Sequence, residues 1–259
     1  RRAVSLLDED IDALEEAWEK AGLRGSDRTV KVQAPGPDTL AAHLELPNGH
    51  RAITDAGAVR DLAVSLAEGV SAHRAQVSRR LQTPVVVQFD EPSLPAAMAG
   101  RLSGVTSLAP VHPVDEAMVG GLLDDCVAVV GGDVALHSCA EGLSWPLLQR
   151  SSIAAVSVDI ATLTPADLDG IGEFLESGRT VLLGAVPSIQ PTTRLGTEHV
   201  AASVASVTDR LGFARVVLKD RIGVTPACGL AAATPAWARG AIELSQRVAD
   251  ALAEDPEGI

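Results

Sequence analysis

Aromatic side chains are almost missing from this chain, which has no tyrosine and only three tryptophans and three phenylalanines in 259 residues. Bases are usually bound by stacking on aromatic rings, so this composition gives little material for a nucleotide platform. Alanine, valine and leucine are left to form the core. Such a core suits a sheet covered by helices.

Positive charge is also in short supply. The sequence has 21 Lys and Arg against 34 Asp and Glu, a formal net charge of −13. Phosphate backbones and anionic lipid surfaces both attract basic patches, and no basic cluster stands out here. We therefore expect neither a nucleic acid nor a membrane surface as a partner.

Cysteines are few, and long apolar runs are missing. Three cysteines, an odd number in a chain of this size, do not form a disulfide framework, which points to the reducing cytoplasm. No stretch has the length of a transmembrane helix or the form of a secretory signal. The sequence opens at Arg1 inside a helical pattern, so we expect an N-terminally incomplete chain whose residues 1–259 form a single domain.

What the sequence does have is a regular alternation of strand and helix patterns. The expected strands are residues 29–35, 84–92, 134–139, 155–160, 180–186 and 222–226. The expected helices are residues 5–21, a segment from about residue 38, and residues 55–81, 114–123, 143–149, 165–176, 199–211 and 235–252. This order predicts an α/β protein with parallel strands.

The two faces of these strands differ in polarity. One face is apolar, whereas the other is small or polar and carries functional residue types towards the strands' C-terminal ends, as at Asp90 and His137. An open doubly wound sheet would be apolar on both faces, so a (β/α)8 TIM-type barrel fits better. Because only six strands are found, we expect the first two strands of the barrel to be absent from this chain.

His137 and Cys139 are the most informative pair of residues. Side chains two positions apart on a strand point to the same side. An imidazole and a thiolate side by side form half of a tetrahedral zinc site, which Cys228 and a carboxylate could complete. Taken alone, such a pair is more often a pair of ordinary buried residues.

Four motifs in the same order resemble a known family. They are Gln88-Phe89-Asp90-Glu91-Pro92-Ser93-Leu94, His137-x-Cys139, Val158-Asp159 and Thr225-Pro226-Ala227-Cys228-Gly229-Leu230. Together they are similar to the C-terminal catalytic barrel of the cobalamin-independent methionine synthases, in its short single-barrel form. The family's first strand, whose Gly-Ser loop binds the amino acid, is not found here, which agrees with the missing strands inferred above.

The resemblance implies a set of site residues. His137, Cys139 and Cys228 would bind Zn²⁺, and Asp159 stands where the family has a glutamate ligand. Asp90 matches the aspartate that holds the amino group of the substrate. The implied reaction transfers a methyl group to the thiol of homocysteine and gives methionine.

Other positions depart from the family pattern. Gln190 stands where the family has a proton-shuttling histidine, and Ala227 and Ala231 replace an aspartate and a lysine beside the last cysteine. Ala96 replaces a glutamate that contacts folate. The methyl donor therefore stays open between a methylfolate and a methylcorrinoid, the latter free or on a carrier protein.

Several alternatives also stay open. Asp159 could cap the following turn instead of binding metal, and Glu141 is a second candidate carboxylate ligand. Cys126 is expected to be buried in the core. At the level of function, the alternatives are a decarboxylase-like barrel enzyme, which has no use for the cysteines, and a catalytically divergent protein that binds metal or a partner without catalysis.

Overall fold

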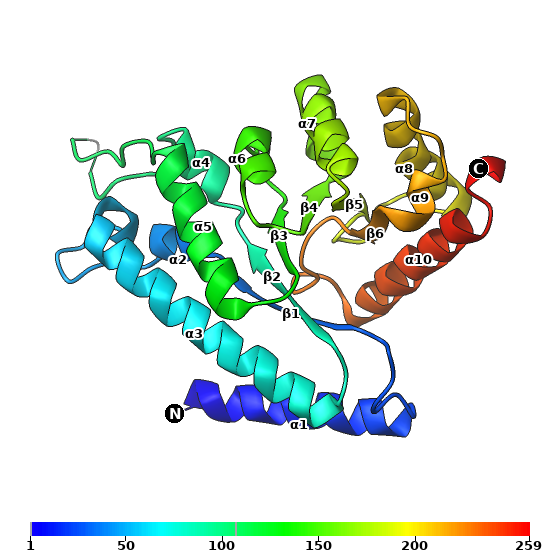
Figure 1. Ribbon diagram of the computed structural model, residues 1–259, viewed down its shortest axis with the longest axis horizontal. Coiled ribbons are helices and arrows are strands. Elements are labelled where there is room, and N and C mark those ends of the chain that lie inside the picture. Colours follow the sequence, from blue (N-terminus) through cyan, green and yellow to red (C-terminus); the bar gives the residue numbers. More distant parts are fainter. Residues whose placement is uncertain (1, 107) are drawn as a thin grey trace.

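One parallel sheet of six strands organises the chain. The computed structural model describes residues 2–106 and 108–259, and its strands lie in the order β1-β2-β3-β4-β5-β6. Their bounds are β1 Val30–Pro35, β2 Val85–Asp90, β3 Val134–Ser138, β4 Ala155–Asp159, β5 Thr180–Val186 and β6 Ile222–Pro226. The sheet curls into half of a barrel (Figure 1). The expected α/β class with parallel strands is confirmed.

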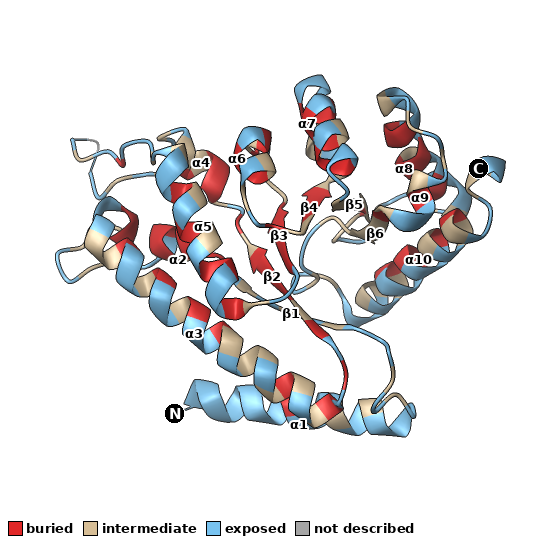
Figure 2. Cartoon of the chain, viewed as in Figure 1, coloured by how far each residue is buried: buried red, intermediate tan, exposed pale blue. Residues whose placement is uncertain are grey.

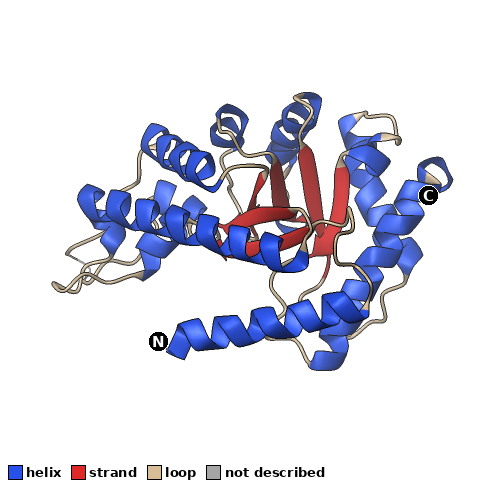
Figure 3. Ribbon diagram, turned by 60° about the horizontal axis from the view of Figure 1, so that its bottom comes forward, coloured by secondary structure: helices blue, strands red, loops and turns tan. Residues whose placement is uncertain are grey.

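Helices follow the outer, convex side of the sheet (Figures 1 and 3). The long ones are α1 Arg2–Lys20, α3 Ala56–Leu81, α5 Glu116–Val130, α7 Pro165–Glu176, α8 Thr197–Leu211 and α10 Pro235–Glu254. The short ones are α2 Pro37–His43, α4 Leu94–Met98, α6 Trp145–Arg150 and α9 Val217–Asp220, with single 3₁₀ turns η1 Ala52–Thr54, η2 Ile160–Thr162 and η3 Pro256–Gly258. No helix in the described part of the chain is long and apolar enough to cross a membrane.

Alternation along the strands separates the core from the concave face. In β2, Val87 and Phe89 are fully buried under the helices, whereas Gln88 and Asp90 point to the other side and line a cavity there. Figure 2 shows the buried residues on the strands and on the helix sides that face them. Burying the β-branched and aromatic side chains on the convex side therefore leaves the concave side for polar residues.

Helix α1 buries fewer residues than the other long helices. Ile11 is its buried residue, in a small cluster with Val77, Leu81 and Val85. Arg80 of α3 forms ion pairs with Asp12, at 2.6 Å, and with Glu15. Ion pairs near the protein surface add little stability, so the Ile11 cluster is the main anchor of α1.

The sheet ends at β1 and β6. Among the described strands, β1 pairs with β2 alone and β6 with β5 alone. The six strands are consistent with part of a TIM-type barrel. Two further strands before β1 remain a prediction. The single, N-terminally incomplete domain also remains a prediction.

Candidate metal centre

The strand register gathers polar side chains at the C-terminal end of the sheet. Asp90 of β2 pairs with His137 of β3, and His137 pairs with Ser157 of β4. These side chains lie on the wall of a cavity of about 550 Å³ on the concave face. The other polar residues and the cysteines of its wall are Lys31, Gln33, Gln88, Cys139, Thr225 and Cys228.

His137 presents one free ring nitrogen. The residue is only 7% exposed, its Nδ1 lies 3.1 Å from Ser157 Oγ, and its buried Nε2 has no hydrogen-bond partner in the described part of the chain. Burial lowers the pKa of His137, an effect that the charge of Asp90 opposes. A neutral imidazole held through Nδ1 has Nε2 available as a metal ligand.

Two thiols complete a three-residue group. Cys139 Sγ and Cys228 Sγ lie 3.2 Å apart. Burial, together with a hydrogen bond to the Cys228 thiol, raises the pKa of Cys139 to about 11. The Cys139 thiol would therefore stay protonated at neutral pH unless a cation compensated the charge of the thiolate.

Gly184 allows the Cys228 segment to come this close. A Cβ atom at Gly184 would lie 2.7 Å from Ala227 Cα and 3.0 Å from Val158 O, closer than packed atoms tolerate. The Ala227 amide donates to Val186 O at 2.7 Å, where the pairing of β5 with β6 shifts register. The absence of a side chain at Gly184 thus positions the cysteine that follows Ala227.

The donor set fits a zinc ion. One ligand atom from each of His137, Cys139 and Cys228 lies within 4.8 Å of the other two. Ligand atoms around tetrahedral zinc lie roughly 3.3–3.8 Å apart, so small side-chain adjustments would suffice. An unpartnered imidazole nitrogen beside two thiols is the arrangement that a soft divalent metal stabilises.

Asp159 and Glu141 lie outside this group. Asp159 Oδ1 accepts a hydrogen bond from the Ala161 amide at 2.9 Å and caps η2, and Thr162 Oγ1 donates to the Asp159 carbonyl at 2.9 Å. Glu141 is exposed in the loop after β3. The structure thus brings together three of the four predicted ligands, while Asp159 makes the alternative contact, a turn cap.

Asp90 belongs to a hydrogen-bonded chain across the cavity. Gln88 Nε2 donates to Asp90 Oδ1 at 2.6 Å, and Lys31 Nζ donates to Gln88 Oε1 at 2.6 Å. Gln33 Nε2 also donates to Asp90 Oδ2 at 3.4 Å. Burial lowers the pKa of Lys31, an effect that the charge of Asp90 opposes. Lys31 and Gln88 were not predicted as site residues, although strand alternation puts both on the polar face.

Gln190 lies away from the metal centre. It is exposed in the loop after β5 and lines a different cavity, together with Trp237 and Arg247. In this structure it therefore has no direct access to the 139/228 thiol pair.

The comparisons with known proteins agree with this architecture. The family model for the catalytic domain of cobalamin-independent synthases matches residues 1–251. The curated proteins contain no match. Among solved structures, a methyltransferase from Methanosarcina mazei shares the fold, with a TM-score of 0.60 and 16% sequence identity, over 94% of this chain and 63% of that one.

This chain thus spans less than two thirds of its structural relative. The YdjI aldolase from Escherichia coli K12 has a TM-score of 0.32 and 10% identity, over 94% of this chain and 93% of that one, too distant a likeness to support a conclusion. At 16% identity, the likeness to the Methanosarcina mazei methyltransferase shows a shared fold. The chain belongs to the cobalamin-independent synthase family, and the match is to its catalytic domain.

Proposed function

We propose that this protein is a zinc-dependent methyltransferase that methylates the thiol of homocysteine to give methionine. The observation that carries the proposal is the His137, Cys139 and Cys228 group, which shares one cavity with the carboxylate of Asp90. A decarboxylase would have no use for two adjacent thiols. The family match supplies the reaction type, methyl transfer.

Three side chains would hold the zinc ion: His137 through Nε2, and Cys139 and Cys228 through sulfur. When bound, zinc would hold the acceptor sulfur as a thiolate, the nucleophilic form of a thiol. Ser157 keeps the His137 ring in place through Nδ1. Asp159 is proposed as the fourth protein ligand. To bind the metal, its carboxylate would have to release the hydrogen bond from the Ala161 amide.

The hydrogen-bonded chain suits the two charged ends of an amino acid. Asp90 would accept hydrogen bonds from the substrate ammonium group, and Lys31 would donate to its carboxylate, with Gln88 between them. Both charges are held in position before the substrate arrives, which reduces the cost of orienting it. A thiol of the right chain length would then reach the cysteines on the same wall.

The methyl donor is proposed as a methylfolate or a methylcorrinoid, with a carrier protein as one source of the corrinoid. Ala96 stands where the family pattern has a glutamate that contacts folate, so both donors should be tested. We further propose that the reaction takes place in the cytoplasm.

The test combines metal content with activity. The full chain should bind close to one zinc ion and methylate homocysteine with one of the two donors. Cys228→Ser should lose both properties, whereas Cys126→Ser should keep both because Cys126 is buried under α3, 3.7 Å from the Ala63 carbonyl oxygen. A folded, metal-free protein would contradict the proposal.

A second candidate is a divergent member that binds zinc without transferring methyl groups. The cap made by Asp159 and the position of Gln190 in another cavity favour it. Stoichiometric zinc without product from either donor would support this candidate over the enzyme.

A further inference from the structure

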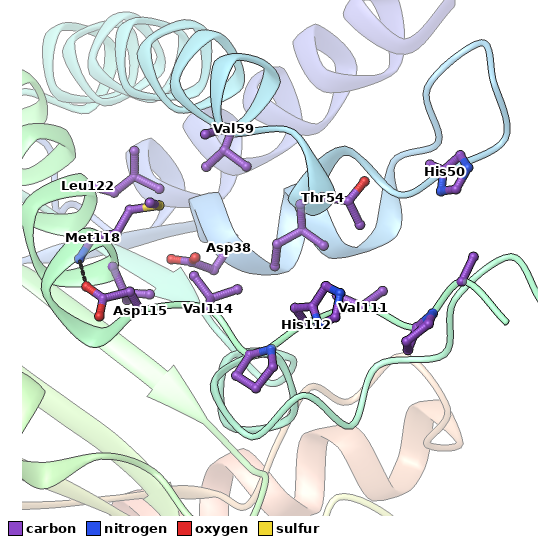
Figure 4. Close-up of a pocket in the computed structure, with 16 residues that line it drawn as sticks. Asp38, His50, Thr54, Val59, Val111, His112, Val114, Asp115, Met118 and Leu122 are labelled. Carbon is purple, nitrogen blue, oxygen red and sulfur yellow. Dashed lines mark hydrogen bonds between the residues drawn. The ribbon is translucent and has the colours of Figure 1, made fainter. Parts of the chain in front are cut away.

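A second cavity lies on the other side of the sheet, among the covering helices. It has a volume of about 360 Å³ and lies between α2, α3, α5 and the segment 109–115 (Figure 4). Its wall is mostly apolar, and includes Ile53, Val59, Val114, Met118 and Leu122. We call it the outer cavity. It shares no wall residue with the metal centre.

Two aspartates interrupt this apolar wall, and Asp115 already accepts hydrogen bonds from the Ala117 and Met118 amides. Asp38, in the first turn of α2, is 1% exposed, and its buried Oδ2 atom has no hydrogen-bond partner in the described part of the chain. Figure 4 shows its side chain among those of Val59, Leu122 and Val114. Burying an unpaired carboxylate in such surroundings is costly. A bound ligand with a hydrogen-bond donor could pair with this unpartnered oxygen atom at the cavity wall.

The neighbouring Glu91 cannot satisfy Asp38. Glu91 Oε1 accepts from the Asp38 amide at 2.9 Å, and Oε2 accepts from the Thr39 amide at 2.8 Å and from Thr39 Oγ1 at 2.7 Å. These bonds fix the first turn of α2, and Gly36 leaves the room for them, since a Cβ there would lie 2.1 Å from Glu91 Oε1. Two acidic side chains are therefore buried together, and both of them are acceptors when ionised.

The cavity wall offers no strong cation in return. Its described residues include two histidines, His50 and His112, but neither lysine nor arginine. Figure 4 shows His50 at the opposite end of the cavity from Asp38. Arg51, the arginine next to this wall, donates to the carbonyls of Ser103 and Ala42 instead. A positive charge that stabilises the ionised form of Asp38 would therefore have to come from a bound ligand.

We propose that the outer cavity binds a small primary amine with an apolar body, whose ammonium group donates hydrogen bonds to the Asp38 carboxylate. The hydrocarbon part would lie against Val59, Val114 and Leu122. A volume of about 360 Å³ is at the lower end of the range for small-molecule sites. The net charge of −13 favours a cationic ligand over an anionic one. This site is independent of the proposed methyl transfer.

The chain offers a clean reporter for the test. Its only methionines are Met98 and Met118, and of the two only Met118 lines the outer cavity. With ¹³C-methyl methionine labelling, titration with 2-phenylethylammonium should shift the Met118 signal in a saturable way and leave Met98 unchanged. 2-Phenylethanol, which has the same body without the charge, should bind about tenfold more weakly or worse, since hydrogen bonds to charged groups contribute more.

Variants separate the carboxylate from the rest of the cavity. Asp38→Asn keeps the shape and should weaken amine binding about tenfold or more while changing alcohol binding little. Asp61→Asn removes the same charge from the exposed side of α3 and should leave both titrations unchanged. Val59→Phe, which fills the cavity, should abolish the Met118 response to both probes.

Four results would overturn the proposal. They are no saturable shift of Met118 with the amine, equal binding of amine and alcohol, full amine binding to Asp38→Asn, and a Val59→Phe protein that binds as before. Each readout is a binding curve, so none depends on zinc or on methyl transfer.

Discussion

The metal centre and the outer cavity lie on opposite sides of the same sheet. Each contains a buried polar atom without a hydrogen-bond partner in the described part of the chain, but the surroundings of the two atoms differ. On the concave side, a ring nitrogen of His137 lies within 4.8 Å of the sulfur atoms of Cys139 and Cys228, so three protein groups converge on one place. On the convex side, Oδ2 of Asp38 faces a mostly apolar wall without a hydrogen-bond partner in the described part of the chain. Convergence of donors indicates an ion held by the protein, whereas a lone charge in an apolar cavity indicates an organic ligand with one charged end.

Changing pH should separate the two regions most strongly. Burial raises the pKa of Asp38 to about 7 from an ordinary value of 3.8. A raised carboxyl pKa means that the folded state holds the proton more tightly, so its contribution is neutral below pH about 4 and destabilising as pH rises through 7. Asp38→Asn should therefore match the wild type in unfolding free energy at low pH and exceed it at pH 8 by up to about 4 kcal/mol.

Urea unfolding at several pH values measures this difference. Asp61→Asn, the exposed control, should show no such divergence. The pKa of Glu91 is raised to about 8 by burial and by the charge of Asp38. Asp38→Asn removes the second cause, so a smaller rise of the Glu91 pKa adds to the difference in the same direction. Parallel stability curves for wild type and Asp38→Asn would show that the Asp38 carboxyl is not buried as described.

Gly184→Ala tests whether the close backbone approach at Gly184 positions the Cys228 segment on the concave side. The added methyl group would press on Ala227 Cα and Val158 O, so we expect a loss of about 1–3 kcal/mol in unfolding free energy and weaker zinc binding. Gly121→Ala, an exposed α5 position with no atom within 4 Å, should be neutral or stabilising. Equal stability of the two variants would contradict the role of Gly184 in positioning the Cys228 segment. The outer cavity should bind its amine in both variants.

Ser157→Ala removes the group that orients His137 without removing a ligand. Partners of this kind typically contribute about tenfold or more to metal affinity, so we expect zinc to bind about tenfold more weakly in a competition with a chelator. The exposed Ser65→Ala serves as the control. An unchanged affinity would mean that His137 is held by packing alone or does not bind the metal.

Asp159→Ala should have the smallest effect if the carboxylate is only a cap. Loss of the bond from the Ala161 amide should cost about 1 kcal/mol of stability, with zinc affinity close to that of the wild type. A fall in affinity as large as that caused by Cys228→Ser would instead place Asp159 among the ligands. This variant therefore decides between the two roles left open for Asp159.

The concave side was largely predictable because strands have a simple period. Side chains two apart share a face, so strand alternation alone puts His137 and Cys139 on one side, and Gln88 and Asp90 likewise. Helix α7, with bounds Pro165–Glu176, and strands β5 and β6 also match their expected limits. The closeness of Cys228 was implied by family resemblance, and its physical cause, the missing side chain at Gly184, depends on tertiary contact.

The convex side was not predictable in the same way. The outer cavity is made by α2, α3, α5 and a loop, and no single period links Asp38 to Val59 and Leu122. Helices α4 and α9, with bounds Leu94–Met98 and Val217–Asp220, are too short to show helical periodicity. Asp159 caps a local turn, and its side chain is one methylene shorter than that of glutamate.

The most direct test of the central claim is X-ray absorption spectroscopy at the zinc edge of the zinc-loaded full chain. The account predicts two sulfur ligands at about 2.3 Å and at least one nitrogen ligand at about 2.0–2.1 Å in the wild type and in Cys126→Ser, whereas Cys228→Ser should retain no zinc with this coordination. A zinc ion coordinated only by nitrogen and oxygen, or a spectrum unchanged by Cys228→Ser, would contradict it.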